Sequence, residues 1–172
     1  QLPLFNTMYA DRDGHIMYLF NTASPVRPRG DHSFWSGVAP GDDSELIWSE
    51  AIVPYDELPK VIDPLNGWVQ NCNDSPWTCT YPMVIGPEMS PAYVAPPPSL
   101  GPRAQRSIRL LSQTDEISLA DLREMKLSTY VELADQFVDD LVAAARELGG
   151  ERAQRAAEIL EQWDRETESW SD

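Results

Sequence analysis

The chain has 172 residues, 42% of them hydrophobic, with six Trp, six Tyr and four Phe, which is enough apolar side chain to bury one core. Its formal charge of −15 argues against nucleic acid and anionic membranes as partners, because both require a basic face. No apolar run approaches the roughly 20 residues of a membrane span. The composition therefore predicts a folded protein whose partners are neither nucleic acid nor membrane.

The first predicted elements are two strands joined by a tight turn. Residues 5–10 and 15–20 are rich in aromatic and aliphatic side chains, and the turn between them contains Asp13-Gly14. This pattern is typical of a β-hairpin. Asp11 and Asp13 also suggest calcium, but two carboxylates without further oxygen ligands favour a plain turn.

The middle of the chain is predicted to be largely irregular. Residues 22–64 are rich in proline, glycine and aspartate, and residues 67–71 are predicted to form a third strand. Six prolines between residues 82 and 98 exclude regular structure over most of the stretch that follows, up to Pro102.

Polar amides are concentrated just after the predicted third strand, between Asn66 and Trp77. Amide side chains are buried only where each donor and acceptor is satisfied, so the cluster indicates a ligand site, with a plain turn as the alternative. Cys72 and Cys79 lie seven residues apart around it. Both a disulfide and two reduced thiols are consistent with this spacing.

After Pro102 the sequence becomes helical. Ser118 and Asp121 form a capping pattern that opens a helix ending near Leu127. Apolar residues from Val131 to Val142 recur at helical spacing before Gly149-Gly150, and a last helix spans roughly residues 151–165. The residues predicted to be buried in these last two helices are Val131, Leu133, Ala134, Phe137, Val138, Leu141, Val142, Ala156, Ile159, Leu160 and Trp163.

Common catalytic motifs are missing from the sequence: there is no Gly-rich phosphate loop, no His-Glu-x-x-His and no Gly-x-Ser-x-Gly. His15 starts a predicted strand, which favours a structural role, and His32 lies in a loop where it is either solvated or bound to an anion. Arg103 and Arg106 begin the helical half. Arginines in such positions fix a carboxylate or a backbone carbonyl, so functional and structural roles both remain open.

Three sequence blocks, in order, resemble the penicillin acylase family of N-terminal-nucleophile hydrolases, and especially its homoserine-lactone acylase-like branch. The first block runs from Asn6 to Tyr18 with Pro25 and Arg27, the second from Pro54 to Pro76, and the third from Arg103 to Asp135. The resemblance implies an α+β chain that is part of a four-layer αββα fold. Residues 1–101 would form its strand and loop part and residues 102–172 its helical part, within one domain.

The resemblance also implies an activity and site residues. Such enzymes use a serine freed by autoproteolysis, whose own α-amine is the general base, to hydrolyse N-acyl amides through an acyl ester. Asn73 matches the oxyanion-hole asparagine, Arg103 the arginine that orders it, and Phe5 a position lining the acyl pocket. Trp68 and Asn71, which belong to the amide cluster, are also predicted to bind the substrate.

Other family features are expected outside these residues. The family's nucleophilic serine lies well upstream, and relatives continue beyond the C-terminal end, so the chain is interpreted as an internal, catalytically silent fragment of an acylase β chain. Its expected partners are the α chain, the rest of the β chain and a small N-acyl amide, in the periplasm. No cofactor is expected, and calcium in the parent stays open. The alternatives are a binding module that uses Trp68 and Trp77, and a calcium-dependent structural domain.

Overall fold

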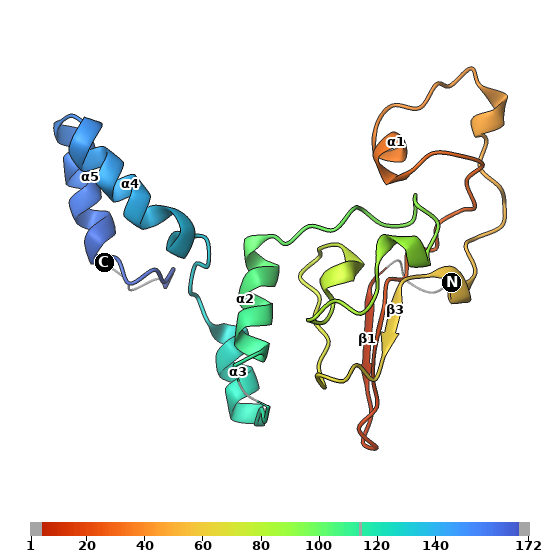
Figure 1. Cartoon of the computed structure of the whole chain (residues 1–172), viewed down its shortest axis with the longest axis horizontal. Coiled ribbons are helices and arrows are strands. Elements are labelled where there is room, and N and C mark those ends of the chain that lie inside the picture. Colours follow the sequence, from red (N-terminus) through yellow and green to blue (C-terminus); the bar gives the residue numbers. More distant parts are fainter. Residues whose placement is uncertain (1–4, 114, 169–172) are drawn as a thin grey trace. The chain divides into compact units, whose positions relative to one another are not determined.

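A computed structural model describes residues 5–113 and 115–168 (Figure 1). Its contacts divide the chain into two compact units, residues 1–111 and residues 112–172, which are described separately below. The division at residue 101 was predicted from the change from strand and loop to helix, and helix α2 (Pro102–Leu111) begins at that change. By its contacts, however, α2 belongs to the first unit.

The predicted hairpin is present at the start of the first unit. Strands β1 (Thr7–Ala10) and β2 (Ile16–Leu19) are antiparallel, with Tyr9 opposite Met17. The Asp11 carboxylate closes the turn by accepting from the backbone N–H groups of Asp13 (2.9 Å) and His15 (3.0 Å). It therefore acts as a turn former, as the sequence favoured.

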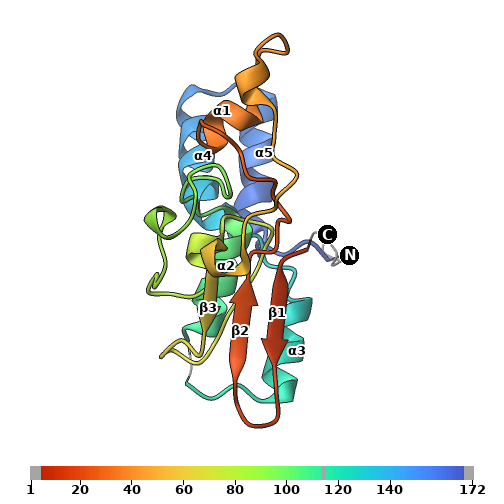
Figure 2. The same cartoon turned by 90° about the vertical axis from the view of Figure 1, so that its right-hand side faces the viewer.

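The third strand lies earlier in the sequence than predicted. Strand β3 (Lys60–Ile62) pairs antiparallel with β2, which gives the sheet order β1-β2-β3 (Figure 2). The strand predicted at residues 67–71 is wrong, and the stretch from 22 to 64, which was predicted to be an irregular connection, contains β3. Both neighbouring positions of β2 are already occupied, and Gln70 instead donates a single backbone hydrogen bond to the Cys79 carbonyl (2.7 Å).

The main core of the first unit covers one face of this sheet. Val61 lies opposite Tyr18, and both are buried with Trp77, Cys79, Ile85 and Ala95. Trp77 is only 2% exposed, and its indole Nε1 donates to the Pro96 carbonyl (2.7 Å). The proline-rich stretch is therefore irregular, as predicted, but it supplies core contacts as well as connections.

Short helical turns interrupt the loop between β2 and β3. Helix α1 (His32–Ser36) is capped by Asp31, whose carboxylate accepts from the Phe34 N–H (2.8 Å). Single 3-10 turns also span Ser44–Leu46 and Tyr55–Glu57 in this loop, and Pro76–Thr78 and Pro87–Met89 after β3. Val53 and Leu58 of the loop form a second buried cluster with Val94.

The second unit is helical, as predicted. It contains α3 (Leu119–Leu127), α4 (Ala134–Leu148) and α5 (Glu151–Gln162). The predicted cap of α3 is confirmed, since Ser118 and Asp121 form a reciprocal capping box. Helices α4 and α5 pack against each other as a hairpin across Gly149-Gly150 (Figure 1). Among the described residues, no helix combines the length and apolar character that crossing a bilayer requires.

The buried face of this helical hairpin is narrower than predicted. Its buried residues are Ala134, Val138, Val142 and Ala157. Phe137 and Leu141 are 58% and 55% exposed, and Leu133, Ala156 and Ile159 are also exposed, so the prediction that these five are buried is wrong. In this unit, each helix buries only the residues that face the other helix. The adjacent apolar residues of α4, Phe137 and Leu141, stay exposed.

Candidate functional site

The amide loop at residues 71–74 is shaped by side chains that bond to nearby backbone. Asn71 Oδ1 accepts from the Asn73 N–H (2.9 Å), and Asp74 Oδ1 accepts from the Cys72 N–H (3.0 Å). Asn73 has a backbone φ of 60°, in the left-handed region that asparagine tolerates better than most residues. The sequence pattern therefore produces a turn that places Asn73 at its apex.

The base of this loop is fixed to the core. Asp74 Oδ2 accepts from the Thr78 hydroxyl (2.6 Å), and Gln70 Nε2 donates to the Thr78 carbonyl (2.7 Å). Gln70 and Thr78 are both buried, whereas Asn73 is exposed. The glutamine of the amide cluster is thus structural, and Asn73 projects from a rigid support. Asp74 and Thr78, which carry that support, were not predicted from the sequence.

Arg103 approaches Asn73 from the first turn of α2. Its Nη1 lies 3.4 Å from Asn73 Oδ1, and its backbone carbonyl accepts a long hydrogen bond from Cys72 Sγ (3.6 Å). A guanidinium has only donors, so the atom of Asn73 that faces it must be the oxygen. The amide nitrogen then points away from Arg103.

The Nδ2 group of Asn73 is available to a ligand. It makes no hydrogen bond with any of the residues that the structure describes. An exposed amide donor held by a fixed loop and oriented through its oxygen is suited to an oxygen atom that gains negative charge. Asn71, Asn73 and Arg103 therefore form one hydrogen-bonded group, which is the candidate site.

The other two predicted site residues lie outside this hydrogen-bonded group. The Phe5 side chain is 74% exposed at the edge of the described chain, and Trp68 is half-buried. The Trp68 carbonyl accepts from the Thr80 hydroxyl (3.0 Å), so its backbone supports the core below the amide loop. The proposed contacts of Phe5 and Trp68 with a substrate remain predictions.

The alternative of a binding surface formed by Trp68 and Trp77 is wrong for Trp77, because that side chain is buried in the core. His15 takes the structural role expected of it, with Nδ1 2.8 Å from Asp63 Oδ2. Within the described ranges, no group of three or more His, Cys, Asp or Glu side chains is placed to hold a metal ion.

The two cysteines are reduced thiols with different surroundings. Cys79 is buried in the core, and this burial raises the pKa of its thiol to about 12. Cys72 is half-buried in the amide loop and contacts Arg103 through the hydrogen bond described above. The spacing of the cysteines was consistent with a disulfide or with two reduced thiols, and the structure has the two reduced thiols.

A mixed α and β chain that presents an oriented amide donor fits a protein that stabilises a carbonyl oxygen. Comparison with models of known protein families matches residues 1–171 to the penicillin amidase family. The chain belongs to this family. The resemblance seen in the three sequence blocks is thereby confirmed at the level of the family, and membership indicates an acylase-type amide hydrolase as the parent protein.

Proposed function

We propose that residues 1–172 belong to an N-acyl amide hydrolase of the homoserine-lactone acylase-like branch, and that they supply half of its oxyanion hole. The observation that carries the proposal is the pair formed by Asn73 and Arg103. Arg103 engages the amide oxygen of Asn73, which leaves the amide N–H groups to donate to the substrate carbonyl. The assignments of Asn73 and Arg103 come from the resemblance, and this hydrogen bond supports them.

The proposed reaction begins at a serine outside residues 1–172, within a four-layer αββα fold. The serine hydroxyl adds to the acyl carbonyl while the α-amine of that serine takes its proton. Negative charge then develops on the carbonyl oxygen, where Asn73 Nδ2 donates a hydrogen bond. Collapse of this intermediate returns the proton to the departing amine and leaves an acyl ester, which water hydrolyses. Phe5, Trp68 and Asn71 line the substrate side of the site in this proposal.

The proposed partners are the remaining segments of the same acylase. Helix α4 exposes Phe137 and Leu141 one turn apart, beside Leu133, which is 43% exposed. An uncovered apolar stripe of this kind is typical of a surface that packs against other protein. We place the assembled enzyme in the periplasm, as the resemblance implies.

The test uses the complete natural gene product and the hydrolysis of N-acyl amides of graded chain length. Asn73→Gly relieves the positive φ and removes only the amide, so the enzyme is expected to fold while kcat falls on the order of 100-fold or more. Asn71→Ala removes a residue of the same site, and the acceptor of the Asn73 N–H, but no proposed oxyanion donor, so it should cost less than Asn73→Gly. Turnover by Asn73→Gly equal to that of the unaltered enzyme would overturn the proposal.

A further inference from the structure

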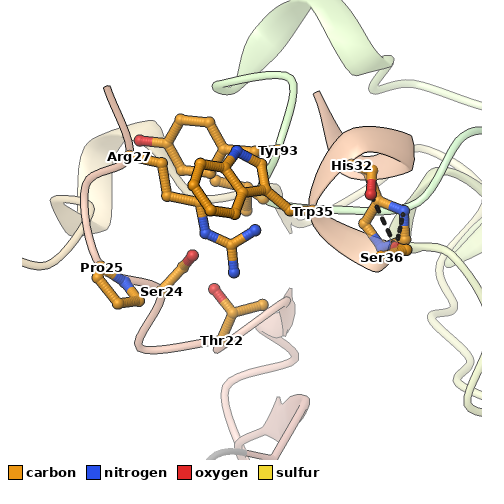
Figure 3. Close-up of a pocket in the computed structure, with 9 residues that line it drawn as sticks. Thr22, Ser24, Pro25, Arg27, His32, Trp35, Ser36 and Tyr93 are labelled. Atoms are coloured by element: carbon orange, nitrogen blue, oxygen red, sulfur yellow. Dashed lines mark hydrogen bonds between the residues drawn. The ribbon is translucent and has the colours of Figure 1, made fainter. Parts of the chain in front are cut away.

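The first unit contains a polar cavity of about 250 Å³ in the loop that follows β2 (Figure 3). Its walls include Thr22, Ser24, Arg27, His32, Trp35 and Tyr93. Asn73 and Arg103 do not line it. Binding of a ligand in this cavity is therefore independent of the proposed amide hydrolase activity.

Arg27 is enclosed by aromatic rings. Its guanidinium carbon lies 4.9 Å from the Trp35 ring centroid, 5.0 Å from that of Trp48 and 5.6 Å from that of Tyr93. The guanidinium points toward the hydroxyl groups of Thr22 and Ser24 (Figure 3). Aromatic faces attract the positive charge, but they do not satisfy its N–H groups, which need acceptors.

Two polar atoms at this cavity lack such partners. Arg27 Nε and Thr22 Oγ1 are both buried, and neither has a hydrogen-bond partner within residues 5–113 and 115–168. Buried polar atoms in folded proteins are nearly always bonded to protein, water or a ligand. The Nε–H group of Arg27 and the hydroxyl of Thr22 therefore both line the cavity, and neither is bonded to a described residue.

The neighbouring Arg29 shows that carboxylates are within reach of this loop. Arg29 forms ion pairs with Asp43 and with Glu45, the latter at 3.4 Å. Among the described residues, Arg27 has no ion pair, although the chain carries 28 acidic residues. Since Arg27 is enclosed and has no carboxylate partner among the described residues, its negative counter-ion is expected to be a ligand.

We propose that this cavity binds the carboxylate of a small organic acid. Arg27 pairs with the carboxylate in the plane of its guanidinium, Thr22 and Ser24 donate from their hydroxyls, and Trp35 and Tyr93 enclose the apolar part of the molecule. One arginine balances one negative charge, so the site favours a monocarboxylate over a phosphate or a dicarboxylate, which the acidic chain would repel.

The test measures benzoate binding by the 172-residue chain and by the complete gene product, with neutral benzamide as the matched probe. The readout is the NMR signal of the Arg27 Nε–H group, assigned by its loss in Arg27→Met. Saturable movement of this signal with benzoate, at a dissociation constant at least tenfold below that for benzamide, is expected. Arg29→Met should bind benzoate normally.

Thr22→Val removes one hydroxyl while keeping the side-chain shape, so it tests the site even if Arg27→Met fails to fold, and it should weaken binding severalfold. Equal affinity for benzoate and benzamide, or no movement of the Nε–H signal in either protein, would overturn the proposal and leave Arg27 as a support for the aromatic rings. A third outcome is that the 172-residue chain binds benzoate and the complete gene product does not. This would support a carboxylate site but overturn a free acid as its occupant, since another segment of the complete protein would then fill the cavity.

Discussion

Arg103 Nη1 lies 3.4 Å from Asn73 Oδ1 across 30 residues of sequence. The contact joins the first turn of α2 to the apex of the amide loop, so neither element alone fixes the orientation of the Asn73 amide. The loop supplies the backbone conformation, and the helix supplies the cation that holds the oxygen. Asn73 Nδ2 is left to donate to a ligand.

Replacing Arg103 by methionine is expected to lower the kcat of the complete enzyme about 10- to 100-fold, because the Asn73 amide loses its orienting partner. The measurement is the rate of amide hydrolysis at saturating substrate. Arg109→Met, two turns further along α2, is the matched control and should retain activity. Equal losses in the two variants would show that Arg103 acts only through helix stability.

The same pair predicts non-additive effects in a double-mutant cycle. If Arg103 acts through Asn73, then Arg103→Met should have little further effect on kcat in an Asn73→Gly enzyme. The four enzymes are compared with one substrate at one pH. Effects that simply multiply would mean that the two residues contribute independently.

The ion pair between His15 and Asp63 predicts a pH-dependent contribution to stability. Donation from the His15 imidazole to the Asp63 carboxylate raises the pKa of His15 above its ordinary 6.5, so this contribution is lost as the pH rises through the raised value. The Ile16 N–H and His15 lower the pKa of Asp63 below 3.8, so the contribution is also lost as the pH falls through that value. The pair is therefore fully formed between pH 3.8 and 6.5.

Asp63→Asn tests this window, because asparagine still accepts from the Ile16 N–H and tolerates the φ of 48°. The difference in Tm between the variant and the unaltered chain should be larger at pH 5.5 than at pH 8.5. Asp13→Asn, an exposed change in the hairpin turn that precedes His15, controls for general charge effects. A difference in Tm that is the same at both pH values would rule out the ion pair as its source.

Helix α5 offers a matched pair of neighbouring alanines. Ala157 is 0% exposed against α4, whereas Ala156 is exposed. Ala157→Leu is expected to lower the free energy of unfolding by about 1–3 kcal/mol through overpacking, and Ala156→Leu should change it little. Urea denaturation followed by circular dichroism measures both. A larger loss in Ala156→Leu would contradict the helix pairing.

The two thiols should differ in their reactivity. Burial raises the pKa of Cys79 to about 12, so only about one Cys79 side chain in 10,000 is in the thiolate form at pH 8. Iodoacetamide at pH 8 should therefore alkylate Cys72 first, and unfolding should be needed before Cys79 reacts. Peptide mass spectrometry identifies the labelled residue. A Cys72–Cys79 disulfide in the untreated protein would overturn this prediction.

Local sequence signals predicted those elements whose hydrogen bonds are themselves local. Asp13-Gly14 marked the hairpin turn, Ser118 and Asp121 marked the start of α3, and Gly149-Gly150 marked the break between α4 and α5. The third strand was predicted in the wrong place, because β-pairing depends on which segment reaches the edge of β2. Its three residues between Pro59 and Pro64 carry too short a pattern to show this.

Sequence alone also identified the family, because a motif preserves the order and types of residues that a site requires, and it predicted Asn73 and Arg103 as site residues. Only the tertiary structure decided that Trp77 is core and not surface, that Gln70 anchors the loop, and that Arg103 meets the amide oxygen of Asn73. It alone placed Arg27 among three aromatic rings, with no ion pair to any carboxylate in the part of the chain that the structure describes. Burial and ion pairing are relations between residues distant in sequence, so their physical cause lies in the folded chain and not in any local pattern.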